Sequence, residues 1–232
     1  PMIEIGGMPI IWHIMKIYSQ HGVNDFIICC GYKGYVIKEY FSNYFLHESD
    51  ITFYMKNNSI KVHQKRAEPW VVTLINTGEN SMTGGRLRRV SDYVKDEDAF
   101  CFTYGDGLSD VNIKKLISFH IKNNKVATLT AVKYRNPKGV LIIKKNFQVN
   151  KIKEKPTEFI NGGFFVLSSR IFKYLKNSKT IFEQDCLPQL TKINQLIAYK
   201  HLGFWGCMDT IREKKELNKI YKSKQTAWKI WV

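Results

Sequence analysis

Hydrophobic residues in the first half of the chain alternate between helical and strand spacing. Pro9 suits a first helical position, apolar side chains recur from Ile10 to Tyr18, and Gly22 ends the predicted helix. The next stretch, 25–31, is apolar on both faces, as in a parallel strand covered by helices. The same spacing rules predict helices at 33–45, after Gly85 and at 112–123, and strands at 51–55, 71–76, 99–103 and 126–132.

Beyond residue 133 the spacing changes to short strands, and helices return only near the end. We predict strands at 140–143, 149–152 and 162–167, and helices at 182–192 and 209–222. Alternating strands and helices are typical of a doubly wound open sheet. We therefore expect an α/β fold with a doubly wound, mostly parallel, Rossmann-like sheet and a small β-rich region. One domain over 1–232, made of parts 1–132 and 133–232, is the simplest organisation.

The charge and the cysteine content limit which kinds of binding partner and which cellular compartment we expect. Lys and Arg number 36 against 20 Asp and Glu, so the surface favours anionic partners, although free use of Lys explains the excess equally well. No run of five basic residues marks a nucleic-acid-binding arm. The five cysteines are odd in number and lack C-x-x-C spacing, which argues against a disulfide framework or a thiolate zinc site. With no signal peptide and no bilayer-length apolar run, we expect a cytoplasmic protein without nucleic-acid or membrane partners.

The loop 104–107 is the first candidate for chemistry. It follows a predicted apolar strand and places Asp106 between Gly105 and Gly107. Ligands of doubly wound folds bind at the carboxyl edge of the sheet, where a carboxylate suits Mg²⁺ and glycines allow close approach. A turn that uses Asp and Gly only for backbone geometry explains the same residues.

A second acid, Asp209, follows an aromatic stretch and precedes the last predicted helix. Taken alone, it is best explained as a helix N-cap, because Asp is a favoured capping residue. Paired with Asp106, it becomes a candidate for the second carboxylate on one Mg²⁺.

Two further segments offer groups to an anion. The polar loop that begins at Ser81 runs through Gly84 and Gly85 into Arg86, so backbone N–H groups, a helix N-terminus and a guanidinium could meet a phosphate. It lacks the G-K-[ST] ending of a P-loop, and a capped surface helix with a basic face explains it as well. Farther along, Glu154, Lys155 and Gly162 combine a compact positive charge with a glycine, although a surface charge and a turn are the simpler explanation.

In chain order, these segments resemble one family, the glucose-1-phosphate cytidylyltransferases of the sugar nucleotidyltransferases. The resemblance runs over nearly the whole chain, to residue 229. It is carried by the segments 3–15, 26–34, 80–86, 102–107 and 203–210. Collinear motifs of this length are far more specific than any one of them.

The resemblance implies a fold of the nucleotide-diphospho-sugar transferase type and a Mg²⁺-dependent reaction. CTP and α-D-glucose 1-phosphate would give CDP-glucose and pyrophosphate, for dideoxysugar and O-antigen lipopolysaccharide synthesis. Residues 1–132 would bind nucleotide and 133–232 the sugar, and the chain would form a homo-oligomer. The implied site has Asp106 and Asp209 on Mg²⁺, nucleotide contacts from Ser81, Arg86 and Gly105, and sugar-phosphate contacts from Glu154, Gly162 and the catalytic Lys155.

The residue inventory agrees with such a reaction. The attacking group is a phosphate oxygen that is already ionised at neutral pH, so neither a His base nor a Ser nucleophile is needed. The site must supply in-line positioning and neutralise charge on the α-phosphate and the leaving pyrophosphate. Two carboxylates on Mg²⁺ and a few cations do both.

The sequence departs from the family pattern in two ways. The Gly-rich signature loop, with its Gly-Thr-Arg and following Lys, and the strand before it are absent from residues 1–232, so we expect little activity and a sheet without a central strand. The stretch 134–139 also departs from the Arg-Phe-Gly pattern expected near the sugar, and the loop 156–161 is short, so these segments leave the identity of the sugar open. A transferase for another sugar or base, a non-catalytic sugar-nucleotide-binding remnant, and a nucleic-acid binder drawn by the +16 charge remain as alternatives.

Overall fold

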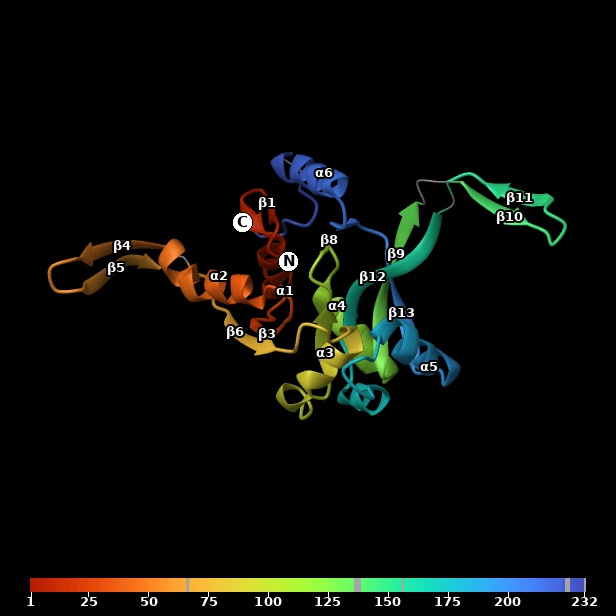
Figure 1. The fold of residues 1–232 in the computed structure, drawn as a ribbon, viewed down its shortest axis with the longest axis horizontal. Helices are drawn as coiled ribbons and strands as arrows, with labels where there is room; N and C mark the ends of the chain where they lie inside the picture. Colours follow the sequence, from red (N-terminus) through yellow and green to blue (C-terminus); the bar gives the residue numbers. More distant parts are fainter. Residues whose placement is uncertain (66, 136–138, 156, 224–225, 232) are drawn as a thin grey trace.

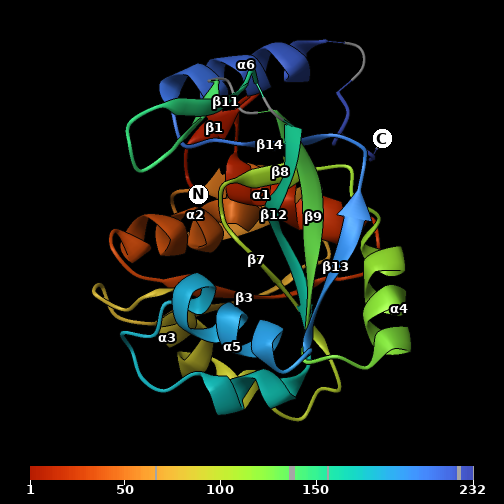
Figure 2. The same cartoon turned by 90° about the vertical axis from the view of Figure 1, so that its right-hand side faces the viewer.

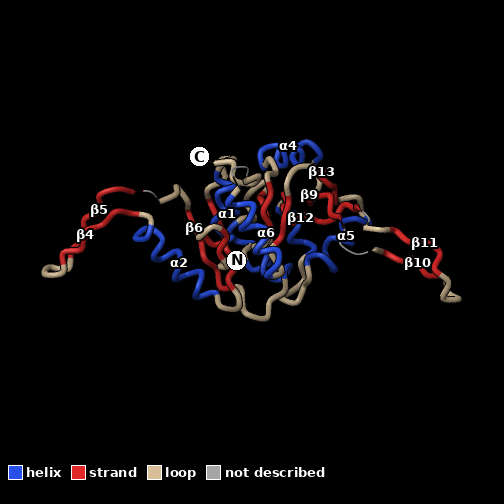
Figure 3. Tube along the Cα trace, turned by 90° about the horizontal axis from the view of Figure 1, so that it is seen from above, coloured by secondary structure: helices blue, strands red, loops and turns tan. Residues whose placement is uncertain are grey.

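Two β-hairpins project from opposite ends of a body of strands and helices (Figures 1 and 3). This arrangement is seen in a computed structural model, which describes residues 1–65, 67–135, 139–155, 157–223 and 226–231. The helices are α1 (Ile10–Ser19), α2 (Gly34–His47), α3 (Thr83–Arg89), α4 (Ile113–Asn123), α5 (Leu187–Lys192) and α6 (Ile211–Lys222). Two 3₁₀ turns, η1 (Ser91–Tyr93) and η2 (Ser169–Tyr174), and one π-helical turn, η3 (Phe182–Cys186), complete the helical elements among these residues.

The strands fall into one larger sheet and several two-stranded ones. The larger sheet has the order β13-β9-β12-β7, with β13 parallel to β9 and the other pairs antiparallel. Its strands are β7 (Phe100–Thr103), β9 (Ala127–Arg135), β12 (Thr157–Leu167) and β13 (Leu196–His201). Figure 2 shows β12, β9 and β13 side by side, with α6 beyond one end of them.

Each two-stranded sheet joins a different pair of segments. The strands β3 (Asp25–Cys30) and β6 (Val71–Asn76) are parallel. The antiparallel pairs are β1 (Glu4–Ile5) with β2 (Met8–Pro9), β8 (Gly107–Ser109) with β14 (Trp205–Cys207), β4 (Ser49–Tyr54) with β5 (Ser59–Lys65), and β10 (Val140–Ile143) with β11 (Val149–Lys153). The last two pairs are the projecting hairpins. The mixture of helices and strands confirms the expected α/β class. Among the described strand pairs, however, only β9–β13 and β3–β6 are parallel, so the expected predominance of parallel pairs is not seen in them.

Two buried clusters hold the body together. In one, Ile10, Ile14 and Ile17 of α1 pack with Leu108 and with Trp228 near the C-terminus. In the other, the sheet packs against the segments that follow β12, with members such as Phe165, Phe182, Leu187 and Leu190. The larger sheet contains strands from both sides of residue 132, and the two buried clusters pack around it.

A cavity of about 680 Å³ separates β3 from β7. Residues 25–29 line one side, 99–103 line the other, and Ile11, Ile14 and Tyr18 of α1 contribute to its wall. Among the described residues β3 pairs only with β6, and β7 only with β12, so each strand presents an unpaired edge to the cavity. The cavity explains why most of β3, predicted to be buried on both faces, is only half-buried.

Helix α3 differs from its prediction, because it begins at Thr83 and contains the two glycines that were expected to precede it. A side chain on Gly85 would place its Cβ 2.1 Å from the carbonyl oxygen of Ser178, so the glycines allow the helix to pack against that backbone. The predicted helix 182–192 is divided into the turn η3 and the short α5. The spacing rules missed β1, β2, β5, β8 and β13, because these strands are two or three residues long or carry polar residues.

Within the described ranges, no helix is both long and apolar enough to cross a membrane.

Candidate active site

The loop at the end of β7 lies directly against the segment that follows β14. Strands β8 and β14 pair with Cys207 opposite Gly107, and the Met208 N–H continues the ladder by donating to the Asp106 carbonyl at 2.9 Å. Two segments about a hundred residues apart in sequence therefore place Asp106 and Asp209 on neighbouring turns. The sequence analysis paired the two acids as candidate ligands of one Mg²⁺, and two such ligands must lie close together.

The two carboxylates interact electrostatically. Burial raises the pKa of Asp106, and the negative charge of Asp209 raises it further, while the Pro1 amino group acts in the opposite direction. Asp209 is exposed, so this pair has one half-buried oxygen donor and one that faces solvent. Adjacent carboxylates that repel each other are a donor set that a hard divalent cation satisfies, so these residues fit the metal site that the resemblance implies.

The start of α6 settles the alternative role of Asp209. The N-cap is Thr210, whose hydroxyl accepts from the Glu213 N–H at 3.2 Å. The Glu213 carboxylate accepts from the N–H groups of Asp209 and Thr210, both at 2.8 Å. The prediction that Asp209, taken alone, is the cap was therefore wrong, and its carboxylate is left to another role.

Cys207 is a neighbour that the sequence analysis missed. Its Sγ and the carboxylates of Asp209 and Glu213 offer ligand atoms within 4.8 Å of one another. Burial raises the pKa of the Cys207 thiol to about 12, with Glu213 and Asp209 adding to the effect. The thiol therefore stays protonated at neutral pH, and the carboxylates are the better ligands.

Gly162 lies beside the carboxylate loop. Its carbonyl accepts from the indole N–H of Trp205 at 2.8 Å, and a Cβ at Gly162 would come within 2.7 Å of Val132 Cγ1. A Cβ on Gly107 would in turn lie 3.9 Å from the Gly162 oxygen. Gly162 therefore lies near Gly107 and Trp205, and its contact with the sugar phosphate stays a prediction.

Arg86 organises the turn that precedes α3. Its guanidinium donates to the Thr77 hydroxyl at 2.7 Å and to the Glu79 carbonyl at 3.1 Å. Ser81 donates its hydroxyl to the Thr77 carbonyl at 2.5 Å. A Cβ on Gly31 would lie 2.2 Å from Arg86 Nη1, so only glycine allows the guanidinium to rest there. These partners were not anticipated.

The expected cradle of free N–H groups is only partly present. The Arg86 N–H donates to the Met82 carbonyl at 2.8 Å at the start of α3, and the Gly85 N–H donates to the Thr180 carbonyl at 3.1 Å, in the segment that packs against this helix. Arg86 and Gly105 nevertheless line the same cavity, together with Pro1. The cavity thus joins the turn before α3 to the carboxylate loop.

Glu154 and Lys155 are placed differently. Both are exposed and follow β11, the second strand of a hairpin that leaves the body (Figure 1). Lys155 has a left-handed backbone, with φ of 42°. No described contact joins either residue to the Asp106 loop. The neighbouring Pro156 and residues 136–138 of the departing stretch lie outside the described residues.

Comparison with known proteins decides the family. Residues 1–210 match the nucleotidyl transferase family. The whole chain is 54% identical to glucose-1-phosphate cytidylyltransferase of Salmonella typhimurium and 40% identical to the probable enzyme of that name from Bacillus subtilis, and covers 91% of each. The chain belongs to the nucleotidyl transferase family. As a member it is an enzyme chain, and nucleotidyl transferases of this family commonly use a divalent metal, which agrees with the paired carboxylates.

Solved structures of other nucleotidyl transferases share the fold. HddC from Yersinia pseudotuberculosis superposes with a TM-score of 0.67 at 23% identity, over 96% of this chain and 89% of that one. A UDP-glucose pyrophosphorylase gives a TM-score of 0.66 at 17% identity, over 97% of this chain and 90% of that one. At these identities the likeness confirms the expected nucleotide-diphospho-sugar transferase fold and nothing finer.

Proposed function

We propose that the protein transfers the cytidylyl group of CTP to α-D-glucose 1-phosphate, giving CDP-glucose and pyrophosphate. The observation that carries the proposal is full-length similarity to glucose-1-phosphate cytidylyltransferases, combined with the juxtaposed carboxylates of Asp106 and Asp209. CDP-glucose would serve dideoxysugar and O-antigen synthesis in the cytoplasm. In this assignment residues 1–132 bind the nucleotide and 133–232 the sugar.

The reaction is a single displacement at phosphorus. A phosphate oxygen of the sugar phosphate forms a bond to the α-phosphorus of CTP. The bond from that phosphorus to the bridging oxygen breaks, and its electron pair leaves with pyrophosphate. The attacking oxygen is already ionised, so the chain's residues position and neutralise rather than remove a proton.

Residues on the two loops divide this work. Asp106 and Asp209 hold Mg²⁺, which when bound neutralises charge on the phosphates. Arg86, Ser81 and Gly105 contact the nucleotide, and the cavity shared by Arg86 and Gly105 supports this assignment. Gly162 approaches the sugar from beside the carboxylate loop. Glu154 and Lys155 contact the sugar phosphate, Lys155 as a catalytic charge, and they reach it only if the hairpin arm or a second subunit brings them there.

We also propose that the chain forms a homo-oligomer. The hairpin β10–β11 exposes apolar side chains on both faces, and an isolated two-stranded hairpin is marginally stable in water. Their exposed fractions range from 37% to 90%, for Val140, Leu141, Ile142, Ile143, Phe147, Val149 and Ile152. A second copy of the chain would cover this surface.

The decisive assay is pyrophosphate release from CTP and glucose 1-phosphate with Mg²⁺. The assay is run on residues 1–232 and on a chain that carries the family's Gly-rich signature loop before Pro1, and we expect pyrophosphate release from at least one of them. Other nucleotides and sugar phosphates, run in parallel, distinguish a transferase for another base or sugar. If both chains are folded and silent but bind CDP-glucose in calorimetry, the catalytic proposal is wrong and a sugar-nucleotide-binding protein remains.

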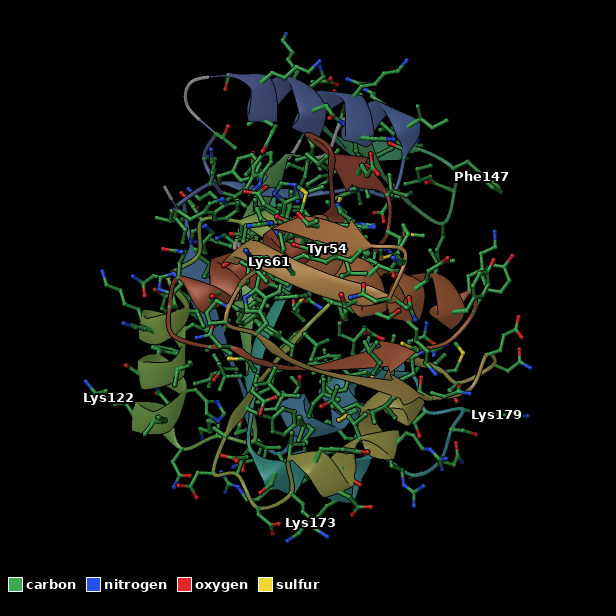
Figure 4. All side chains as sticks on the ribbon, turned by 90° about the vertical axis from the view of Figure 1, so that its left-hand side faces the viewer. Tyr54, Lys61, Lys122, Phe147, Lys173 and Lys179 are labelled. Atoms are coloured by element: carbon green, nitrogen blue, oxygen red, sulfur yellow. The ribbon has the colours of Figure 1, made fainter. Side chains whose placement is uncertain are left out.

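The +16 charge does not favour nucleic acid as the partner. Figure 4 shows that Lys122, Lys173 and Lys179 point outward from separate parts of the body, and Lys61 lies on the hairpin β4–β5. A nucleic-acid surface gathers such charges on one face. Retention on DNA that weakens steeply with salt would contradict this view.

A further inference from the structure

One carboxylate, that of Glu183, lies between the loop 104–107 and the turn before α3. The Tyr104 hydroxyl donates a short hydrogen bond to Glu183 Oε1, and the Thr83 hydroxyl donates to Oε2 at 2.8 Å. Tyr104 immediately precedes Gly105 and Asp106, and Thr83 is the first residue of α3, which carries Arg86. Glu183 therefore contacts both the metal side and the nucleotide side of the site, although no sequence pattern singles it out.

The backbone around Glu183 is fixed from two directions. Its neighbour Phe182 is fully buried and packs edge-on against Phe102 and Phe165. The Phe182 N–H donates to the Thr83 hydroxyl oxygen at 2.9 Å, so Thr83 uses both of its hydrogen-bonding functions on the turn η3. The carboxylate is thus held on a packed element rather than on a free loop.

The Tyr104 end is equally constrained. Its ring lies over Gly163, where a Cβ would come within 2.8 Å of Tyr104 Cδ2. Its N–H donates to the Gly163 carbonyl at 3.2 Å, and the Asn161 amide donates to its hydroxyl at 3.3 Å. The side-chain oxygen Oδ1 of Asn161 accepts from the Gly163 N–H at 3.0 Å. Movement of Tyr104 away from Glu183 would disturb each of these contacts.

We propose that Glu183 is a positioning residue that couples the two loops, so that occupation of the carboxylates by a divalent cation tightens nucleotide binding near Arg86. The inference rests on the proposed function. The bridge from Thr83 through Glu183 to Tyr104 is a contiguous path of hydrogen bonds between the two loops, and energetic coupling between sites can be carried by such networks. Hydrogen bonds to a carboxylate are stronger than neutral ones, which suits a bridge of two contacts.

The test is the ratio of CTP affinities with and without Mn²⁺, measured by calorimetry on the chain form that is active in the assay above. We expect Mn²⁺ to tighten CTP binding in the unmodified protein, and Glu183→Ala to reduce that ratio by about tenfold, the effect of losing hydrogen bonds to a charged group. Glu183→Gln should restore part of the ratio, because the amide keeps one acceptor and can donate to Tyr104. Affinity for CTP without metal should change little, whereas a merely structural loss would weaken both measurements.

Controls separate coupling from folding and from the function itself. Asp185→Asn alters an exposed acid of the same turn that caps the Ile181 N–H, and should leave the ratio unchanged. Thr83→Val and Tyr104→Phe each remove one of the two hydrogen bonds to Glu183 while keeping side-chain shape, and should give intermediate ratios if Glu183→Ala fails to fold. Thr83→Val also leaves the Phe182 N–H without this acceptor, and Tyr104→Phe does the same to the Asn161 amide, so the two variants are compared with each other. An unmodified protein that binds neither Mn²⁺ nor CTP would overturn the proposed function and this inference with it. A normal ratio in Glu183→Ala, or no coupling in the unmodified protein, would overturn only the inference.

Discussion

At the scale of single residues, the site depends on a division of work between neighbours. Thr210 and Glu213 satisfy the N-terminus of α6, and this leaves the Asp209 carboxylate available beside Asp106. The same logic applies before α3, where Thr77 receives both the Arg86 guanidinium and the neighbouring Ser81 hydroxyl. The chemistry-bearing groups are therefore held by residues that carry no chemistry themselves.

Asp106→Asn and Asp209→Asn should each abolish metal-dependent activity. Each change removes one charged oxygen donor, and since loss of even an outer partner costs about 10–100-fold in metal affinity, a direct ligand should cost about 100-fold or more. Mn²⁺ binding measured by electron paramagnetic resonance checks the effect independently of turnover. Asp92→Asn is the matched control, because Asp92 is exposed and pairs only weakly with Lys95 at 3.3 Å. Normal Mn²⁺ affinity in both site variants would show that the carboxylates are not the ligands.

Sequence reasoning found the carboxylates but not their supports. Asp106 and Asp209 lie near the ends of apolar stretches, where the hydrophobic spacing changes from that of a strand to that of a helix. The sequence alone therefore marks both positions. Glu183 lies inside an apolar helical pattern and Thr77 at the end of a strand, and nothing local marks either of them. Their roles arise from contacts over 100 and 9 residues of separation, which spacing rules cannot supply. The roles of Lys155 and Glu154, like those of the other site residues, stay predictions.

At the scale of elements, α3 shows how a close contact overrides helix propensity. Two adjacent glycines are poor helix formers and led to the prediction that the helix follows Gly85. The structure includes both, because Gly84 and Gly85 face the backbone of residues 178–180. The elements with long, regular apolar spacing, such as α1 and α4, were predicted closely. The three-residue β8 was missed because so few residues carry too little pattern, and β5 was missed because polar residues interrupt its pattern.

Gly85→Ala should destabilise the protein in spite of a better helix former. Alanine gains about 1 kcal/mol in helix propensity, but its Cβ would lie 2.1 Å from the Ser178 carbonyl oxygen, and overpacking against backbone costs about 1–3 kcal/mol or more. Chemical denaturation should show a net loss of about 1–2 kcal/mol in the free energy of unfolding. Gly139→Ala is a suitable control, since its nearest neighbour is the end of the flexible Glu154 side chain at 3.0 Å. A more stable Gly85→Ala would contradict the packing argument.

At the scale of the whole molecule, the cavity between β3 and β7 should bind an apolar dye. Its lining comes largely from Ile, Phe, Leu and Val side chains, and apolar cavities of this kind take up apolar ligands. Residues 1–232 should enhance the fluorescence of anilinonaphthalene sulfonate while near-ultraviolet circular dichroism remains that of a folded protein. Ala99→Leu, within the lining, should weaken dye binding, whereas Ala198→Leu, at an exposed position of β13, should not. Equal dye binding by both variants would place the dye elsewhere.

At the same scale, we expect the projecting hairpins to determine whether copies of the chain associate. An exposed strand pair that shows apolar side chains on both faces is unfavourable in water, so burial against a second copy should stabilise it. Ile152, which is 64% exposed, lies on β11. Ile152→Glu would leave a charge in that interface and should shift the protein toward monomer in light scattering coupled to size-exclusion chromatography. Gln148→Glu introduces the same charge at an exposed polar position of the hairpin and should leave the mass unchanged. An unmodified protein that is monomeric at all concentrations would show that these hairpins do not join copies of the chain.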